Sequence, residues 1–336
     1  MSFRFENMVT MEGLYRAWMD FSTDKRTKKD VMAFGANIED ELLMLYEDLI
    51  HDGYRHGPYE RFVVNDPKKR VIHKATVRDR VVHRLVYNML LPVFHLRWLD
   101  CSYSCRPGFG QHRSIADVQK GIQQATRDQS QVCWILKCDV RKFFDSIDQP
   151  ILLRLLFLRI RDERARALLT EIVRSFSVIP NKGLPIGNLT SQFFANVYMH
   201  ELDWHIKHVV KVRRYYRYAD DVLFVCDSFE QANVYHKEIE RFLRMRLCLF
   251  LHPNKVIIRK HTWGIDWLGK VILPDYLLLR PKTQKRMMHK IRELVKKGDT
   301  KKLRSSVGSY HGLLIGTARR SVDRVLLQQV AECRGM

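Results

Sequence analysis

Two adjacent aspartates, Asp220 and Asp221, interrupt a stretch of aromatic and β-branched residues that runs from Arg214 to Val225. An Asp-Asp pair usually belongs to a solvated turn, but Gly, Ser and Asn do not surround this one. Because two carboxylates at the tip of an apolar hairpin repel each other, the pair is unfavourable unless a cation lies beside it. Proteins hold magnesium with one or two carboxylates together with substrate phosphates. The pair therefore indicates a metal-binding turn between two short strands.

A third carboxylate, Asp139, ends an apolar run that begins at Cys133. Such a run is typical of a buried strand. If this strand lies beside the hairpin, Asp139, Asp220 and Asp221 come together and can hold two metal ions. One ion would activate an attacking 3′-hydroxyl, and the other would stabilise a leaving pyrophosphate.

The charge balance points to an anionic partner. The chain has 336 residues, 46% of them hydrophobic, and a formal net charge of +21. Self-repulsion makes so much positive charge unfavourable unless it meets something negative, so nucleic acid is the first expectation and a membrane surface the second. A basic protein without such a partner is the remaining alternative. No segment is typical of a signal peptide or a membrane span, which predicts a cytoplasmic protein that does not enter a membrane.

The elements that must position the acids follow from the spacing of apolar residues. Residues 1–60 favour helices, among them Ile38–Ile50. A basic hairpin comes next, then a helix, the buried strand, a second helix, the acidic hairpin and a basic helical tail. Their predicted ranges are Arg61–Val64 with Arg70–Ile72, Asp79–Leu91, Cys133–Asp139, Asn188–Lys207, Arg214–Val225 and the residues from Lys282 onward.

The tail carries basic side chains at helical spacing. They include Lys282, Lys285, Arg286 and Lys290, with few acids between them. A solvated surface helix would show the same pattern, but a cationic face with so little acidic compensation favours contact with phosphates.

Several blocks of this sequence resemble reverse transcriptases, and they occur in the family's order between residues 60 and 275. Tyr218-Ala219-Asp220-Asp221 resembles the family's catalytic box. The other matching blocks are residues 67–72 with Asp79-Arg80, residues 103–108, residues 137–148, residues 183–192 and Trp267-Leu268-Gly269. The resemblance implies an α+β right-hand polymerase fold with fingers, a ferredoxin-like antiparallel palm and a helical thumb. The N-terminal helices and fingers would occupy 1–130, the palm 131–275, with a fingers-contacting segment near 175–192, and the thumb 276–336.

The resemblance also implies roles for residues at the acidic site. Asp139, Asp220 and Asp221 would bind two Mg²⁺ ions, which Mn²⁺ can replace, with the Val140 carbonyl as a further ligand. Phe144 falls where the family carries an aromatic steric gate that excludes a 2′-hydroxyl and so selects deoxynucleotides. Plain core packing is the alternative for this ring.

Basic residues would hold the substrates. Lys68 and Arg70 lie where the family's fingers bind the incoming triphosphate, a task suited to the guanidinium of Arg. Lys255 matches a lysine near the leaving pyrophosphate, with an ordinary surface lysine as the alternative. Arg80 and Arg106 are expected among the nucleic-acid contacts. The implied substrates are dNTPs, an RNA template and a cDNA or primer duplex.

The third box, at residues 183–192, departs from a common pattern of the family. Group II intron and retroviral enzymes typically read Pro-Gln-Gly-x-x-x-Ser-Pro, whereas Ile186 here replaces the Gln, which normally contacts the incoming nucleotide, and Gln192 replaces the final Pro. The resemblance implies that Ile186 and Gln192 both lie at the dNTP-binding site. This variant is similar to the error-prone reverse transcriptases of diversity-generating retroelements, whose expected partner is a small accessory barrel protein. Losing a polar contact to the nucleotide weakens discrimination by about 1–3 kcal/mol, so Ile186 is predicted to lower fidelity. The alternative is a neutral lineage difference.

Two other interpretations stay open. A related reverse transcriptase of an antiviral defence system would carry similar boxes. A catalytically silent RNA-binding protein on the same scaffold is a different class of answer. The three acids argue against a silent protein, since binding alone does not need them.

Overall fold

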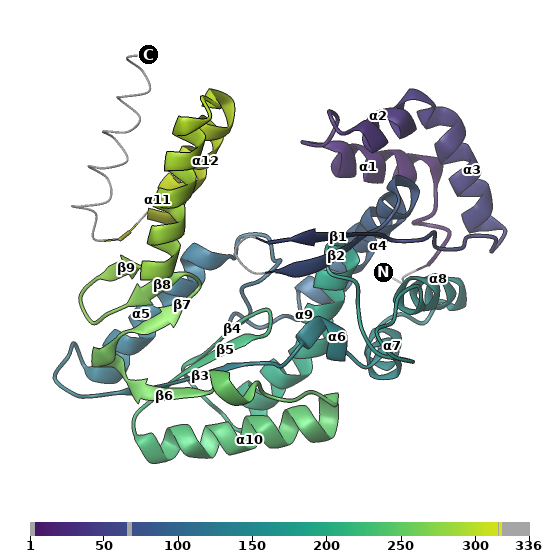
Figure 1. Cartoon of the computed structure of the whole chain (residues 1–336). Coiled ribbons are helices and arrows are strands. Elements are labelled where there is room, and N and C mark those ends of the chain that lie inside the picture. Colours follow the sequence, from purple (N-terminus) through teal and green to yellow (C-terminus); the bar gives the residue numbers. More distant parts are fainter. Residues whose placement is uncertain (1–3, 66–68, 315, 318–336) are drawn as a thin grey trace. The chain divides into compact units, whose positions relative to one another are not determined.

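The computed structural model describes residues 4–65, 69–314 and 316–317, and it mixes helices with antiparallel sheet (Figure 1). Two compact units account for the contacts. The first unit contains Met1–Gly110, Lys137–Leu223 and Val234–Val256, and the second contains Gln111–Leu136, Phe224–Asn233 and Ile257–Met336. The chain passes between the units several times, so their boundaries differ from the predicted fingers, palm and thumb boundaries, which stay a prediction.

Three helices near the N-terminus and a fourth after a hairpin form one packed group in the first unit: α1 (Met11–Ser22), α2 (Lys29–Ala36), α3 (Ile38–Ile50) and α4 (Val77–His95). Helix α1 begins where the Thr10 hydroxyl accepts a hydrogen bond from the Gly13 amide at 3.0 Å, which satisfies one of the unpaired donors of the first turn. Apolar residues on one face of α1, among them Leu14 and Trp18, are buried. The predicted helices Ile38–Ile50 and Asp79–Leu91 are confirmed.

The basic hairpin is confirmed as β1 (Glu60–Val64) and β2 (Arg70–Lys74), which pair antiparallel with Val64 opposite Arg70. The predicted turn between them includes residues 66–68, which lie outside the described residues, and so does the candidate triphosphate ligand Lys68.

A four-stranded sheet carries the acidic positions. Its strands are β3 (Trp134–Asp139), β4 (Tyr215–Tyr218), β5 (Asp221–Cys226) and β6 (Ile257–Lys260), in the order β4-β5-β3-β6. The predicted buried strand and acidic hairpin are confirmed, and they are neighbours in the sheet. The apolar core of β5, from Val222 to Cys226, is fully buried, which explains its unbroken apolar sequence.

The remaining helices of the first unit are α6 (Phe143–Ser146), α7 (Gln149–Phe157), α8 (Glu163–Arg174), α9 (Leu189–Trp204) and α10 (Phe229–Leu247), the last of which begins in the second unit. The predicted helix Asn188–Lys207 is confirmed through Trp204. From His205 to Val209 it continues as a π-helical turn, in which the Val210 amide donates to the His205 carbonyl at 3.0 Å. The spacing of apolar residues alone does not predict where the helix changes from α-helical to π-helical hydrogen bonding.

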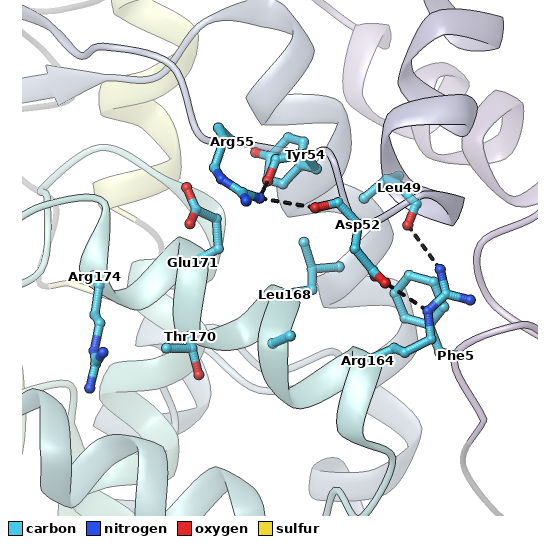
Figure 2. A pocket seen from close by; sticks show the side chains of 11 residues that line it. Phe5, Leu49, Asp52, Tyr54, Arg55, Arg164, Leu168, Thr170, Glu171 and Arg174 are labelled. Carbon is cyan, nitrogen blue, oxygen red and sulfur yellow. Dashed lines mark hydrogen bonds and ion pairs between the residues drawn. The ribbon is translucent and has the colours of Figure 1, made fainter.

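Arg164 on α8 holds this helix against the chain that follows α3 (Figure 2). Its guanidinium donates to the Leu49 carbonyl at 3.2 Å, pairs with Asp52 at 3.4 Å and lies over the Phe5 ring at 4.4 Å. These residues line a cavity of about 460 Å³. Because its charged walls are used within the fold, we assign the cavity a structural role.

The second unit contains α5 (Gln111–Thr126) and a three-stranded antiparallel sheet of β7 (Ile265–Trp267), β8 (Lys270–Ile272) and β9 (Leu277–Leu279). The Trp267 indole donates to the Ser114 hydroxyl at 2.9 Å and so joins the sheet to α5. The helices α11 (Pro281–Lys296) and α12 (Thr300–Leu314) pack through an apolar cluster that includes Met287 and Leu303. The predicted basic helical tail is confirmed as far as Leu314.

None of the helices in the described part of the chain combines the length and apolar character needed to cross a bilayer.

Candidate active site

The adjacent carboxylates lie where a tight hairpin reverses the chain. Strand β4 ends at Tyr218, strand β5 begins at Asp221, and the two residues between them make the turn. Ala219 adopts a left-handed conformation with φ of +54°, which is uncommon for a residue with a side chain. Asp220 therefore lies within the turn, and Asp221 is the first residue of the next strand.

Asp139 ends β3, the strand next to β5, and its backbone is fixed from the other side. The His252 amide donates to the Asp139 carbonyl at 2.8 Å, and the Arg141 amide donates to the Phe250 carbonyl at 2.8 Å. The buried Val140 lies between these two bonds, and neither of them uses its carbonyl oxygen. The metal role predicted for that carbonyl stays a prediction.

The three carboxylates share one electrostatic environment. Burial, followed by the charges of Asp221 and Asp139, raises the pKa of Asp220 to about 6, and Lys255 opposes that rise. Lys255 forms an ion pair with Asp139 at 2.8 Å. Lys137 lies 3.8 Å from Asp221. Excess negative charge is thus concentrated at the ends of β3 and β5, with two ammonium groups beside it.

Sequence reasoning identified Lys255 but missed Lys137. Lys137 stands two residues before Asp139, and side chains two apart on a strand point to the same face. That spacing was the available signal, but only the neighbouring β5 shows which carboxylate the lysine meets.

The acids meet a chemical condition for binding magnesium without forming a closed cage. Within residues 4–65, 69–314 and 316–317, no three acidic, His or Cys side chains are grouped closely enough to hold a metal by themselves. The oxygen donors nevertheless suit a hard cation. Burial and then repulsion by Asp221 and Asp139 raise the pKa of Asp220, and a bound divalent ion would relieve the repulsion.

A buried ion pair holds the backbone of the acidic turn in place. Arg217 on β4 and Asp203 on α9 are both fully buried and meet through two hydrogen bonds of 2.7 and 2.6 Å. Arg217 also donates to the Ala219 carbonyl at 3.0 Å and to the Ser102 hydroxyl at 2.7 Å. The Tyr215 hydroxyl donates to Asp203 at 2.8 Å.

The Arg217 guanidinium therefore fixes the backbone of the residue just before Asp220. Sequence reasoning missed this pair, although a charged residue inside an apolar strand was a signal, because charged side chains are almost never buried unless paired.

The third box contacts the basic hairpin. The His73 amide of β2 donates to the Ile186 carbonyl at 3.0 Å, and the Asn188 side chain bonds the His73 carbonyl at 2.8 Å and the Ala75 amide at 3.3 Å. Gly187 has φ of +114°, and a Cβ atom there would lie 2.6 Å from Ile72. Ile186, Gly187 and Asn188 thus place β2 beside the start of α9.

The other predicted nucleotide ligands are placed as follows. Arg70 is exposed at the start of β2, and the half-buried Phe144 meets Phe143 edge to face at 5.4 Å. Gln192 is exposed on α9 and accepts a hydrogen bond from the Cys105 thiol at 3.3 Å. Nothing in these contacts tests their roles, which stay predictions.

Two of the predicted nucleic-acid ligands, Arg80 and Arg106, make contacts inside the fold. Arg80 pairs with Asp30 at 2.5 Å and lies over the Phe21 ring at 5.0 Å. Arg106 is buried, bonds the Leu99 carbonyl at 2.6 Å and stacks on Phe109 at 3.8 Å. Both guanidinium groups join segments of the first unit, and contact of either residue with nucleic acid stays a prediction.

The basic helix retains its exposed face. Lys282, Lys285 and Lys290 are exposed on α11 and Arg286 is half-buried, whereas Met287 faces the apolar cluster. Phosphate contact by this face stays a prediction.

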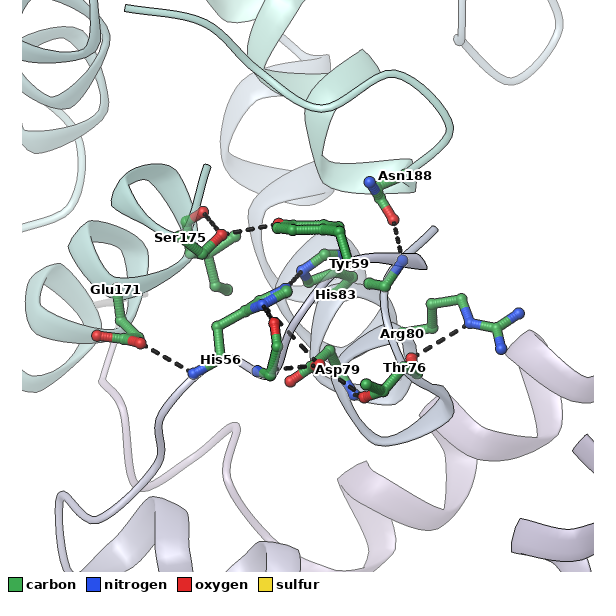
Figure 3. Close-up of polar contacts among 12 residues, drawn as sticks. His56, Tyr59, Thr76, Asp79, Arg80, His83, Glu171, Ser175 and Asn188 are labelled. Atoms are coloured by element: carbon green, nitrogen blue, oxygen red, sulfur yellow. Dashed lines mark hydrogen bonds and ion pairs between the residues drawn. The ribbon is translucent and has the colours of Figure 1, made fainter. Parts of the chain in front are cut away.

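A buried polar cluster joins α4 to the chain before β1 (Figure 3). The Asp79 carboxylate accepts hydrogen bonds from the Tyr54 hydroxyl at 2.8 Å and the Thr76 hydroxyl at 2.6 Å. The ring nitrogens of His56 and His83 face each other at 3.2 Å. Burial and the neighbouring His56 lower the pKa of His83 to about 3.

This cluster makes folding sensitive to acid. Since the pKa of His83 is lower in the folded chain than in the unfolded chain, the unfolded state gains a proton first as pH falls below about 6.5. Protonation of His83 in the unfolded chain should lower the free energy of unfolding by about 1.4 kcal/mol per pH unit, from about pH 6.5 down toward pH 3. Denaturant titrations at pH 7 and pH 5 should show a loss that His83→Gln reduces by roughly 2 kcal/mol. An equal loss in the variant and the wild type would contradict this account of the pair.

Comparison with known proteins identifies the class to which this fold and site belong. A family model described as reverse transcriptase (RNA-dependent DNA polymerase) matches residues 65–272, more than half of the chain. The chain therefore belongs to the reverse transcriptase family of RNA-directed DNA polymerases. The matched range contains all three acids and the third box.

Individual relatives agree with this assignment. Protein YkfC of Escherichia coli is 23% identical over 274 residues, which cover 70% of this chain and 71% of that protein. The group II intron-encoded protein LtrA of Lactococcus lactis subsp. cremoris is 24% identical over 175 residues, which cover 49% of this chain and 28% of LtrA.

Solved structures with a similar fold include telomerase from Candida albicans in complex with a fragment of telomeric RNA. The TM-score is 0.51 at 13% identity, covering 84% of this chain and 55% of the telomerase chain. Apo telomerase from Candida tropicalis gives a TM-score of 0.51 at 10% identity, covering 67% of this chain and 49% of that one. The chain thus spans about half the length of these telomerases. The predicted α+β right-hand polymerase fold is confirmed.

Proposed function

We propose that this chain copies an RNA template into DNA by adding dNTPs to the 3′-hydroxyl of a primer. The observation that carries the proposal is the electrostatic environment at the ends of β3 and β5, where burial and then the charges of Asp221 and Asp139 raise the pKa of Asp220. Family membership supplies the reaction class. A nucleic-acid polymerase also accounts for the net charge of +21. We place this activity in the cytoplasm.

The acids would hold two Mg²⁺ ions, or Mn²⁺ in their place, through Asp139, Asp220 and Asp221. When bound, the ions supply activation of the primer hydroxyl and stabilisation of the leaving pyrophosphate. Lys255, now paired with Asp139, would keep a positive charge near that pyrophosphate. Arg217 would hold the turn so that Asp220 does not move as charge builds up.

The substrates would be held by residues around this centre. Lys68 and Arg70 would bind the triphosphate, and the ring of Phe144 would exclude a 2′-hydroxyl. The exposed basic face of α11 would contact the phosphates of the template–primer duplex.

Primer extension tests the proposal directly. An RNA template annealed to a DNA primer is incubated with the full chain, Mg²⁺ and either dNTPs or NTPs. Extension with dNTPs is expected, together with its loss when EDTA is added. Binding of the duplex without any extension, in Mg²⁺ and in Mn²⁺, would favour the silent RNA-binding alternative.

We further propose that the enzyme belongs to a diversity-generating retroelement and works with a small accessory barrel protein. The third box supports this subtype because Ile186 and Gln192 stand where other reverse transcriptases carry Gln and Pro. An antiviral defence system is the second candidate. A template repeat with a matching variable repeat beside the gene would favour diversification, whereas a surrounding defence island would favour immunity.

Ile186→Gln should restore a polar contact to the nucleotide and lower misincorporation by roughly tenfold, corresponding to about 1.4 kcal/mol of discrimination. Sequencing of cDNA made on a defined RNA measures the error spectrum. Ile186→Leu is the matched control and should leave that spectrum unchanged. If Ile186→Gln and Ile186→Leu give the wild-type error rate, Ile186 is a neutral difference.

A further inference from the structure

Exposed apolar side chains gather in one groove of the first unit, which is lined by elements other than the acidic hairpin. Leu158 after α7, Trp204 at the end of α9, Val209 in the π-helical turn and Met245 on α10 are 63%, 52%, 55% and 69% exposed. All four line a single cavity of about 640 Å³. Scattered exposed apolar residues need no explanation, but a contiguous set in a hollow marks an interaction site.

The groove continues into a second hollow of about 410 Å³, which shares Leu155, Leu158, Glu201 and Trp204 with the first. Trp is among the residues that contribute most binding energy at interfaces, and Trp204 lines both hollows. A continuous apolar groove is the kind of surface into which an amphipathic helix inserts several apolar side chains from one face.

The rim of the groove is strongly basic. Its exposed arginines are Arg97, Arg154, Arg159, Arg241 and Arg246. Arg241 is paired with Glu238 at 2.8 Å. Among the described lining residues, Glu201 is the only acid, and it is half-buried. The rim would therefore repel a basic ligand and attract an acidic one.

We propose that this groove docks an amphipathic helix of a partner protein, with apolar residues facing the floor and Asp or Glu facing the arginines. A second copy of this chain, at net charge +21, would as a whole be repelled by the basic rim. The segment 318–336 has the wrong sign as well, with four arginines and two acids. Single-stranded nucleic acid has the right sign, but apart from Trp204 the most exposed lining residues are the non-aromatic Leu158, Val209 and Met245. The half-buried rings of His205 and Phe242, which also line the groove, are stacked on each other at 4.3 Å.

A displayed library of helical peptides, selected against the full chain, tests this inference. Enriched peptides should carry apolar residues at positions i, i+3 or i+4, and i+7, with acids beside them. Leu158→Glu and Met245→Glu should each weaken the best synthetic peptide at least tenfold. Met32→Glu, at a similarly exposed apolar position on α2, is the matched control and should leave affinity unchanged.

Charge reversal separates the rim from the floor. The double variant Arg154→Glu, Arg246→Glu should lose affinity for the acidic peptide, and a peptide with Lys in place of those acids should recover it. No enrichment, enrichment of basic peptides, or affinity unchanged in Leu158→Glu would overturn the proposal. So would a dimer, or binding of a single-stranded RNA oligonucleotide, that Leu158→Glu abolishes. Primer extension without the peptide should be unchanged in the groove variants, which keeps this test separate from the proposed activity.

Discussion

Replacing Asp220 with Asn should lower the rate of primer extension by about 10³-fold, equivalent to about 4 kcal/mol of lost transition-state stabilisation. Affinity for the template–primer duplex should stay within about twofold, because the exposed basic residues of α11 are unchanged. The same variant should be at least as stable as the wild type. Burial and two neighbouring carboxylates make the ionised form of Asp220 unfavourable in the folded chain, as its raised pKa shows.

Opposite changes in activity and stability are what distinguish a functional acid from a structural one. Asp227→Asn is the matched control, since Asp227 follows the far end of the same strand and is exposed. It should extend primers at the wild-type rate. The two-metal account would fail if Asp220→Asn kept more than a tenth of the wild-type rate, or if Asp227→Asn lost as much.

The acidic site could be predicted from the sequence because its signals are local. One signal is an apolar run that ends on Asp139, and the other is an Asp pair between two apolar arms. Each of them predicts a carboxylate at the end of a buried strand. Secondary-structure period then limits how two such strands can be arranged. Neither segment shows by itself that the two strands are neighbours. The strand order β4-β5-β3 in the structure shows that they are.

Partners that are far apart in sequence could not be predicted in this way. Arg217 and Asp203 lie on a strand and a helix, and nothing in either segment names the other. Asn188 was visible as part of a box, but its task of holding β2 depends on a contact 115 residues away in the sequence. Tertiary packing decides such pairings, and the periodicity of a single sequence carries no information about them.

The positive charge of an arginine also does not show whether its side chain faces a partner or the interior of the fold. The family blocks imply nucleic-acid contacts for Arg80 and Arg106, and in the structure their guanidinium groups lie over the rings of Phe21 and Phe109 inside the first unit. Arginine can satisfy either role because its planar group both pairs with anions and stacks on rings. An Arg within a family block therefore does not by itself show whether its guanidinium joins segments of the fold or contacts nucleic acid, and the roles predicted for Arg80, for Arg106 and for the basic face of α11 stay predictions.

Arg217→Met should destabilise the chain by about 3–5 kcal/mol, because it leaves the Asp203 carboxylate buried without its counter-charge. Adding Asp203→Asn should restore much of that loss, since the amide still accepts from Tyr215 without a charge. Denaturant midpoints of the two single variants and the double variant measure the coupling as a double-mutant cycle. Arg213→Met, at an exposed position on the same segment, should cost less than about 0.5 kcal/mol.

The double variant separates folding from positioning. Even with stability restored, the bond from Arg217 to the Ala219 carbonyl is gone, so Asp220 is no longer held in the left-handed turn. We therefore expect kcat for dNTP addition to fall by about 10²-fold while KM changes little, since the misplaced group acts on the reacting centre and not on binding. If the stabilised double variant turned over at the wild-type rate, Arg217 would be a folding residue alone, and the turn would hold its shape through β4 and β5 without it.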